Sequence, residues 1–515
     1  MLFNSYIFIF LFLPVTLLVF YRIGARGHFR VAIAWLVGAS LFFYGWWNPA
    51  YLGLLLASLI FNYAFGMLLA GARSMGLARR RVLLTIGVGA NLAVLGYFKY
   101  ANFFLGGVNA LTGAHMEFAR VILPLGISFI TFQKIAYLVD AHRGETREYD
   151  FLQFCLFVTF FPQLIAGPIV HHREVIPQFN ETRLYRLNYE NLAVGLTIFA
   201  IGLFKKVLIA DSAALHATPV FDAAAHGAAL TLLDAWSGAL AYTLQLYFDF
   251  SGYSDMAIGL ARLFGIRLPI NFHSPYKAVN IIDFWRRWHI TLSRFLRDYL
   301  YFALGGNRKG PVRRYANLLI TMLLGGLWHG AGWTFVFWGG LHGLYLAINH
   351  AWQALRRRLG GDPARSTTAG RALARFVTFL AVVVAWVFFR AGNLDAALVL
   401  LRGMSGLSGV LLPAEYQPVL AVLAPSGIAF GKLAYSGAWP LLVVLLWVAW
   451  FAPNSMEILR RYRPALTNFS GAMLMATRTP ITWRANRLWM LLTAVLLLAS
   501  ILSMGEVSEF LYFQF

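Results

Sequence analysis

The chain has 515 residues, of which 59% are hydrophobic and only 12% charged, whereas soluble domains carry about 25% charged residues. This composition excludes a large soluble domain and predicts one multi-span, all-α membrane domain with roughly 11 to 13 transmembrane or re-entrant helices. The net charge of +22 is dispersed between apolar runs rather than gathered in one stripe. It therefore indicates cytoplasmic loops and not nucleic-acid binding.

Four apolar spans are expected in the N-terminal part, at 2–20, 31–47, 51–71 and 82–98. The first span has no positive n-region and no cleavage site, so we expect it to be retained. Arginine-rich linkers follow the first and third spans, which places these linkers in the cytoplasm and the N-terminus outside. Cys155 is the only cysteine, so neither an intrachain disulfide nor a multi-cysteine metal site is expected.

The next spans contain helix-breaking residues. Residues 118–139 include the segment Leu123 to Phe129 with a proline and a glycine, and 151–170 includes Pro162 and Pro168. A bend or an unwound turn that faces a cavity is expected in such spans. A further span is expected at 191–210.

Two carboxylates, Asp249 and Asp255, lie in an aromatic stretch within 229–265. A charge that faces lipid would be too costly there. Either Ser254 or Asp255 caps the following helix and Asp249 pairs with an arginine, or these carboxylates take part in a site.

After residue 350 a basic linker is followed by spans at 376–389, 437–452 and 487–503. The sequence shows no convincing internal repeat. We expect one domain, 1–515, composed of N-terminal spans (1–115), a core (116–350) and C-terminal spans (351–515).

The core is organised around residues 284–348. Residues 315–348 contain no Asp, Glu, Lys or Arg. A single helix over them would be about 50 Å long, whereas the bilayer core is about 30 Å thick. The helix must therefore break, either at Gly325-Gly326 or in the turn from His329 to Gly332.

The first part of this core predicts an interfacial helix over 283–299. One face of this helix would be apolar, with Trp285, Trp288 and His289 directed toward the protein. His289 then serves either as a hydrogen-bonded structural residue or in catalysis. The opposite face would be polar and consist of Asp283, Arg287, Thr291, Arg294 and Asp298.

A loop at 305–314 combines glycines with Arg308, Lys309 and two further arginines. It is either a plain cytoplasmic loop that obeys the positive-inside rule or a cradle for the phosphates of a nucleotide-bearing acyl donor. The sequence contains no Walker or dinucleotide-binding glycine motif.

His329 is the strongest candidate for catalysis, because it lies in the apolar segment Leu327 to Trp333. Burial disfavours the charged imidazolium, and a neutral imidazole can take a proton from an alcohol. No nucleophile elbow accompanies it, so direct attack by a hydroxyl on a bound thioester is the simplest scheme. His342 lacks a flanking tryptophan and is expected to be structural.

At these residues the chain resembles the membrane-bound O-acyltransferase family, most of all the branch with the inner-membrane alginate O-acetyltransferase subunit and its cellulose-acetylating relatives. The resemblance covers most of the chain up to about residue 350, whereas 355–485 matches poorly. The matching segments are Tyr97 to Phe103, Leu123 to Phe129, Ile165 to Pro168, Gln245 to Asp255, Phe284 to Ser293, Leu323 to Ala331 and Leu511 to Phe515.

The resemblance implies a fold in which the helices surround a central tunnel, with His329 as the active-site histidine and His289 as the second family histidine. The residues expected to contact the donor are Arg286, Arg287, Trp288, Arg308 and Lys309. Those expected to line the tunnel are Trp285, Trp328, Gln245, Tyr247, Asp249, Ser251 and Tyr253.

The resemblance also implies a function. Acetyl-CoA would be the donor substrate, with no tightly bound cofactor and no metal, and acetyl would cross the inner membrane of a bacterium to O-acetylate an exported polysaccharide such as alginate or cellulose. A periplasmic acetyltransferase or acetyl-carrier protein, or the sugar itself, would accept it. Membrane lipid would surround the protein.

Two other functions are compatible with part of the sequence. A polysaccharide or lipid transporter, or flippase, would share the spans and the buried polar groups, but the sequence lacks repeats and a chain of ionisable groups through the spans. A structural scaffold for a secretion complex would leave His329 unexplained.

Overall fold

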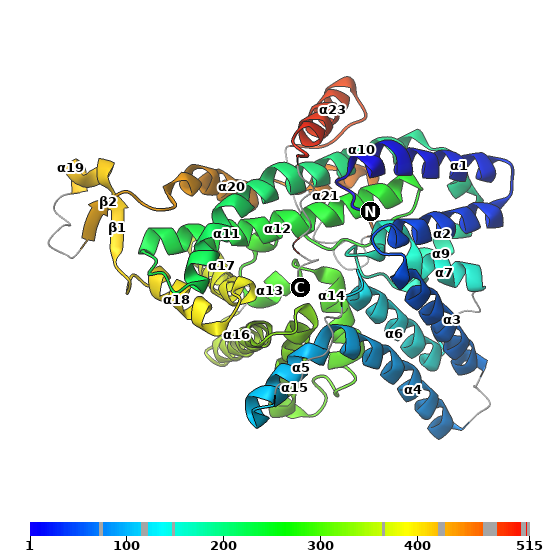
Figure 1. The fold of residues 1–515 in the computed structure, drawn as a ribbon, viewed down its shortest axis with the longest axis horizontal. Coiled ribbons are helices and arrows are strands. Elements are labelled where there is room, and N and C mark those ends of the chain that lie inside the picture. The colour runs from blue at the N-terminus through cyan, green and yellow to red at the C-terminus, as the bar shows by residue number, and fades with distance from the viewer. Residues whose placement is uncertain are drawn as a thin grey trace. The chain divides into compact units, whose positions relative to one another are not determined.

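The computed structural model describes residues 1–71, 76–114, 122–146, 150–362, 366–420, 428–466, 481–505 and 511. The described chain is predominantly helical, with one pair of parallel strands, β1 (Val410–Pro413) and β2 (Ile428–Gly431) (Figure 1). It forms two compact units, each discontinuous in sequence. Of the described residues, unit 1 comprises those within Met1–Phe204, Gly252–Asn271 and Ser455–Gln514, and unit 2 comprises those within Lys205–Ser251 and Phe272–Asn454.

Five of the described helices are long and apolar enough to cross a membrane. They are Phe8–Ala25, Ala50–Gly71, Leu77–Thr112, Tyr189–Ala225 and Thr368–Arg390, and three shorter apolar helices cover Phe29–Gly45, Trp439–Phe451 and Arg487–Leu502. The prediction of an all-α membrane protein is therefore confirmed. The span count, the central tunnel and the divisions near residues 115 and 350 stay predictions.

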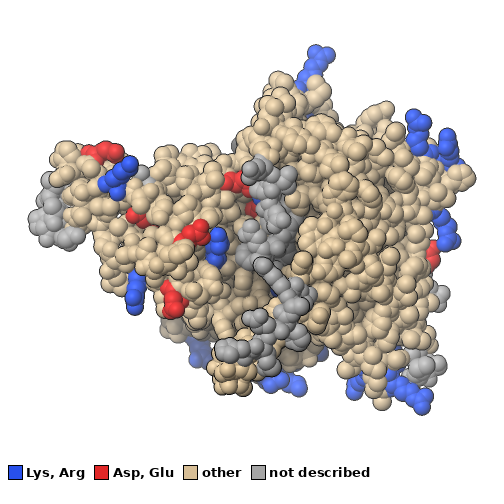
Figure 2. Space-filling model, in the orientation of Figure 1, with Lys and Arg blue, Asp and Glu red and all other residues tan. Residues whose placement is uncertain are grey.

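Charge is sparse on the face drawn in Figure 2. Lys and Arg side chains stand there in small separate groups on a mostly uncharged surface. Such a surface is typical of a chain whose apolar side chains face lipid rather than water.

Unit 1 contains the N-terminal helices in the order expected from hydropathy. Helix α1 packs against α2, and α3 and α4 both pack against α6. The elements of unit 1, with η for 3-10 or π segments, are η1 (Phe8–Phe12), α1 (Leu13–Ala25), α2 (Phe29–Gly45), α3 (Ala50–Gly71), α4 (Leu77–Leu95), η3 (Gly96–Tyr100), α5 (Ala101–Thr112), α6 (Ile127–Arg143), α7 (Phe151–Thr159), α8 (Phe161–Leu164), α9 (His172–Phe179), η4 (Thr182–Tyr185), α10 (Tyr189–Phe204), the C-terminal part of α12 (Leu232–Leu263), α21 (Ser455–Ile458), η11 (Arg460–Tyr462) and α23 (Arg487–Leu502).

The helix breaks expected in this unit are present. Helix α6 begins at Ile127, directly after Gly126 with a φ of 68°, a backbone conformation that favours glycine. Helix α7 ends before Phe160, and α8 starts with Pro162 in its first turn. The N-terminal part of the expected span 118–139 falls on residues 115–121, which lie outside the described residues.

Helix α12 corrects one expectation from the sequence. It runs without interruption over 32 residues, so neither Ser254 nor Asp255 caps a new helix. Asp255 instead accepts a hydrogen bond from Ser455 Oγ at 2.8 Å within unit 1. This bond satisfies a buried carboxylate without breaking the helix.

Unit 2 holds the core segment. Its elements are η5 (Lys205–Ala210), α11 (Asp211–Ala225), the N-terminal part of α12, η6 (Pro275–Lys277), α13 (Ile281–Trp285), α14 (Ile290–Phe295), η7 (Leu296–Tyr301), α15 (Gly310–His329), α16 (Trp333–Arg358), α17 (Thr368–Arg390), α18 (Leu394–Met404), β1, η8 (Ala414–Tyr416), α19 (Gln417–Leu420), β2, η10 (Ser436–Ala438) and α20 (Trp439–Phe451).

The uncharged run breaks at the second of the two expected places, because α15 ends at His329 and α16 begins at Trp333. The two helices pack along each other (Figure 1). A Cβ atom at Gly326 would collide with the Phe335 carbonyl oxygen, and one at Gly339 with the Met322 carbonyl oxygen. Glycine at these positions therefore permits the close approach of α15 and α16.

The single helix expected over 283–299 is wrong. The segment consists of α13, a turn, α14 and the π segment η7. The helix stops because His289 has a φ of 41° and a ψ of 53°, which a right-handed helix does not accommodate. The expected continuous polar face is therefore absent, although Arg287 and Asp283 do pair, with Nε and Oδ1 2.8 Å apart.

Candidate functional site

The two candidate histidines lie at helix ends. His329 is the last residue of α15, and His289 is the N-cap residue of α14. His289 is fully buried and His329 is 5% exposed. Both therefore present their rings inside unit 2, as the sequence predicted for His289.

The left-handed backbone at His289 is secured by the turn that precedes it. His273 N donates to Arg287 O at 2.9 Å, and the Arg287 guanidinium pairs with Asp283 and donates to His273 O at 3.3 Å. A non-glycine residue with positive φ costs energy and persists only where its surroundings fix it. Arg287, expected to bind the donor, thus holds the His289 turn in the described structure.

The rings of His289 and His329 lie close together, with centroids 6.3 Å apart. Trp328 contacts both, at 6.2 Å from His289 and 4.9 Å from His329. Trp328 is itself 3% exposed. The two histidines therefore share a buried aromatic environment.

Three further aromatic rings surround this pair. Phe250 of α12 lies 4.8 Å from His289, and Trp338 of α16 and Phe389 of α17 each lie 5.2 Å from His329. The site is thus built from α12, α14, α15, α16 and α17 of unit 2. We call the rings of His289, His329, Trp328, Trp338, Phe250 and Phe389 the histidine cluster.

His342, which was expected to be structural, lies next to this cluster. Its ring centroid is 4.8 Å from that of Trp338. Trp285 Nε1 donates to His342 Nδ1 at 3.3 Å. Trp285, expected in the tunnel wall, therefore orients His342.

Asp249 of α12 belongs to a buried ion pair whose partner the sequence did not predict. Lys206 Nζ lies 2.9 Å from Asp249 Oδ1 and 2.7 Å from Asp211 Oδ1. The Lys206 and Asp249 side chains are 2% and 3% exposed, so Asp249 pairs with a lysine and not with the expected arginine. The π segment Lys205–Ala210 carries this lysine, and such segments are frequent near functional sites.

The other expected tunnel residues of α12 are all buried. Tyr247 packs 5.1 Å from Tyr276. Gln245 Oε1 and Ser251 Oγ have no hydrogen-bond partner among the described residues. Tyr253 belongs to unit 1, where its ring lies 5.0 Å from that of Phe3.

The residues expected to bind the donor fall into two groups. Arg286, Arg308 and Lys309 are exposed, as side chains that bind soluble phosphates must be. Trp288 is 2% exposed and lies 4.9 Å from Trp386. Trp288 therefore lies in the aromatic core, whereas the three cations lie at the surface.

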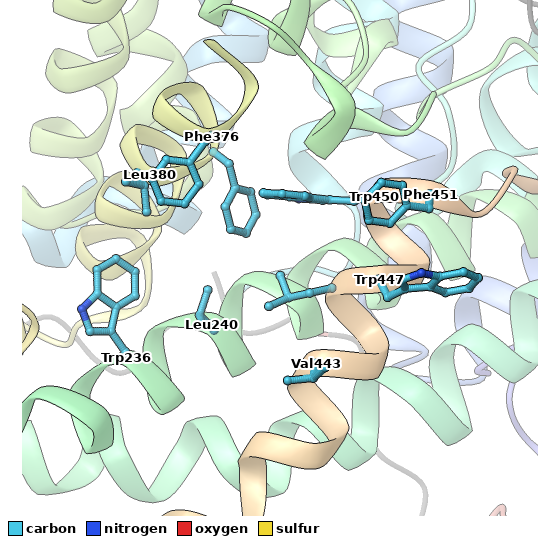
Figure 3. A pocket seen from close by; sticks show the side chains of 10 residues that line it. Trp236, Leu240, Phe376, Leu380, Val443, Trp447, Trp450 and Phe451 are labelled. Carbon is cyan, nitrogen blue, oxygen red and sulfur yellow. The ribbon is translucent and has the colours of Figure 1, made fainter. Parts of the chain in front are cut away.

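A separate apolar cavity of about 490 Å³ lies in unit 2 between α12, α17 and α20 (Figure 3). None of the residues of the histidine cluster lines it. Its wall consists of Trp236, Leu240, Phe376, Phe379, Leu380, Val443, Leu446, Trp447, Trp450 and Phe451. The described residues contain no group of three or more His, Cys, Asp or Glu side chains suited to hold a metal ion.

Sequence reasoning missed Trp338, Phe250 and Phe389 as neighbours of the histidines and Lys206 as the partner of Asp249. For Trp338 a signal existed, because Trp338 and His342 are four residues apart and share one helix face. Lys206 also gave a signal, since a lysine in an apolar run requires a carboxylate partner.

The sequence was compared with known proteins. The membrane-bound O-acyltransferase family matches residues 41–389. A peptidoglycan O-acetyltransferase of Helicobacter pylori is 48% identical over 80% of this chain and 81% of its own length. A probable alginate O-acetylase of Azotobacter vinelandii is 48% identical over 77% and 76%, and a teichoic acid D-alanyltransferase of Streptococcus thermophilus is 29% identical over 52% and 68%.

Proposed function

Because the chain belongs to the membrane-bound O-acyltransferase family, we propose that it transfers acetyl from cytoplasmic acetyl-CoA for the O-acetylation of an exported or cell-wall polysaccharide. The chain is an O-acyltransferase and a membrane protein. The donor, the acceptor and the inner-membrane location belong to the proposal.

The observation that carries the proposal is the pairing of His289 and His329 in one buried aromatic cluster. In the proposed reaction His329 takes the proton of an acceptor hydroxyl, and the oxygen attacks the acetyl carbonyl of the thioester. A neutral imidazole that is shielded from water suits this proton transfer. His289, held by its turn, orients the reacting groups beside it.

The charge distribution supports a nucleotide-bearing donor. Arg286, Arg308 and Lys309 are exposed cations on the segments that lead into the two histidine-bearing helices. Coenzyme A carries phosphates that such side chains bind. The carbonyl carbon of its acetyl thioester is an electrophile that an acceptor hydroxyl can attack.

The names of the relatives indicate the chemical class of the acceptor. Two relatives, each 48% identical to this chain, are named for peptidoglycan and for alginate, and both polymers contain glycan chains with hydroxyl groups. We propose that this chain delivers acetyl to such a polymer, either directly or through a periplasmic acetyltransferase or carrier protein. Cellulose belongs to the same chemical class.

The proposal is tested in cells that lack the chromosomal copy and express wild-type protein or His329→Ala at equal membrane levels. The measurement is ester-linked acetyl on the exported polymer and on peptidoglycan, together with polymer yield. Wild-type protein restores acetyl and His329→Ala does not, whereas His226→Ala, at an exposed histidine, behaves as wild type.

Two outcomes contradict the proposal. Unchanged acetylation with His329→Ala rules out its catalytic role. Normal acetylation with loss of exported polymer favours the transporter reading over acyl transfer.

A further inference from the structure

Two neighbouring side chains of α16 carry buried N–H donors. Trp338 and His342 are both 0% exposed. Trp338 Nε1 and His342 Nε2 have no hydrogen-bond partner among the described residues. Most buried polar groups in folded proteins are hydrogen-bonded, so two adjacent exceptions indicate a ligand that supplies the acceptor.

The hydrogen of His342 is assigned to Nε2 by its neighbour. An indole N–H only donates, and Trp285 Nε1 donates to His342 Nδ1 at 3.3 Å. Nδ1 is therefore the unprotonated nitrogen of a neutral ring, and Nε2 carries the hydrogen. Trp285 thus fixes His342 as a donor at Nε2, the nitrogen for which the described residues offer no partner.

One donor ring, that of Trp338, lies beside the catalytic candidate, and the ring of His342 lies beside Trp338. Trp338 and His342 are separated by one helical turn and share a face of α16. The Trp338 ring lies 4.8 Å from the ring of His342 and 5.2 Å from that of His329. An acceptor atom held by these donors would therefore sit next to the histidine that takes the proton.

Acyl transfer develops negative charge on the carbonyl oxygen, and preorganised donors aimed at that oxygen accelerate it. We propose that Trp338 Nε1 and His342 Nε2 form the oxyanion-binding pair that holds the thioester carbonyl oxygen of the acyl donor. This inference rests on the proposed acyl transfer and assigns a binding subsite within it.

The step balances without a further reactant. His329 takes the proton from the acceptor hydroxyl, the hydroxyl oxygen bonds to the carbonyl carbon, and the carbonyl π pair moves to the oxygen held by Trp338 and His342. Collapse re-forms the carbonyl, breaks the carbon–sulfur bond and releases the thiolate. The thiolate takes the proton from the His329 imidazolium.

The test measures the release of free thiol from acetyl-CoA by purified protein in detergent. The acetyl-CoA concentration is varied so that kcat and KM are obtained separately. Trp338→Phe and His342→Leu each remove one donor, and His342→Gln retains an N–H near the position of Nε2. Trp483→Phe is the matched control, because Trp483 Nε1 is also buried without a described partner but lies in unit 1, against Tyr462.

We expect Trp338→Phe and His342→Leu each to lower kcat by about 10²- to 10³-fold with KM nearly unchanged. His342→Gln should recover a large part of the loss. The double variant should lose less than the product of the single losses, because the two donors act on one oxygen. Trp483→Phe should keep the wild-type kcat.

The inference is overturned if Trp338→Phe and His342→Leu keep the wild-type kcat while His329→Ala abolishes thiol release, a result that leaves the proposed function standing. It is also overturned if the loss of kcat merely follows a lower melting temperature and His342→Gln restores nothing. Wild-type protein that releases no thiol and transfers no acetyl overturns both the proposed function and this inference.

Discussion

The imidazole rings of His289 and His329 have centroids 6.3 Å apart, although one lies at the start of α14 and the other at the end of α15. Their proximity depends on the left-handed backbone at His289 and on the helix break after His329. The geometry of the site is therefore set by two interruptions of helices and not by one continuous element.

The first prediction concerns the His289 backbone. His289→Gly and His289→Ala both remove the ring, but alanine in the left-handed region carries a penalty of about 1 kcal/mol that glycine avoids. We expect His289→Gly to be the more stable of the two, measured as the melting temperature in detergent, and both to lack acyl transfer.

The neighbouring helix provides the control. Thr291 lies inside α14, where alanine should be more stable than glycine by about 1 kcal/mol. If the alanine variant were more stable than the glycine variant at His289 as well, the turn at His289 would carry no backbone strain.

The second prediction concerns the buried Lys206–Asp249 pair. Lys206→Met leaves the Asp249 carboxylate without its cation and should lower the free energy of unfolding by about 3–5 kcal/mol. Replacement of both residues, by Met and Leu, should cost less than the sum of the single changes, measured in a double-mutant cycle.

An exposed ion pair serves for comparison. The Arg183 and Glu181 side chains are 84% and 46% exposed, and such pairs contribute about 0–1 kcal/mol. Arg183→Met should therefore leave stability nearly unchanged. Additive costs for Lys206 and Asp249 would contradict the coupling that the structure shows.

The third prediction concerns the contact between α15 and α16. Gly339→Ala places a Cβ against the Met322 carbonyl oxygen, and overpacking of this kind typically costs about 1–3 kcal/mol. At the adjacent Gly340 a Cβ would meet only Leu323 Cδ2, at 3.5 Å. Gly340→Ala should therefore be neutral or stabilising by about 0.5–1 kcal/mol, and equal melting temperatures for the two variants would count against the packing.

Much of the fold could be predicted because long apolar runs impose helices in a membrane chain. That the uncharged run must break followed from its length against the thickness of the bilayer, but the sequence left two places open, Gly325-Gly326 and the turn after His329. The bend before Ile127 followed from Pro124 and Gly126, whose backbone preferences are local.

The remainder depends on tertiary contacts. Periodicity over 283–299 predicts a helix, but the turn held by Arg287, Asp283 and His273 overrides this local preference. The partner of Asp249 could not be identified from the sequence. Lys206 lies in the π segment η5, which is separated from α12 by the whole of α11. Trp338 and Phe389, the aromatic neighbours of His329 outside its own helix, likewise come from α16 and α17, which no motif connects to the histidine.

The most direct measurement of the central claim is thiol release from acetyl-CoA by purified wild-type protein, His329→Ala and His226→Ala, each with the same melting temperature. We expect release by wild type and His226→Ala and none above background by His329→Ala. Equal release by His329→Ala would show that the chemistry does not depend on this imidazole.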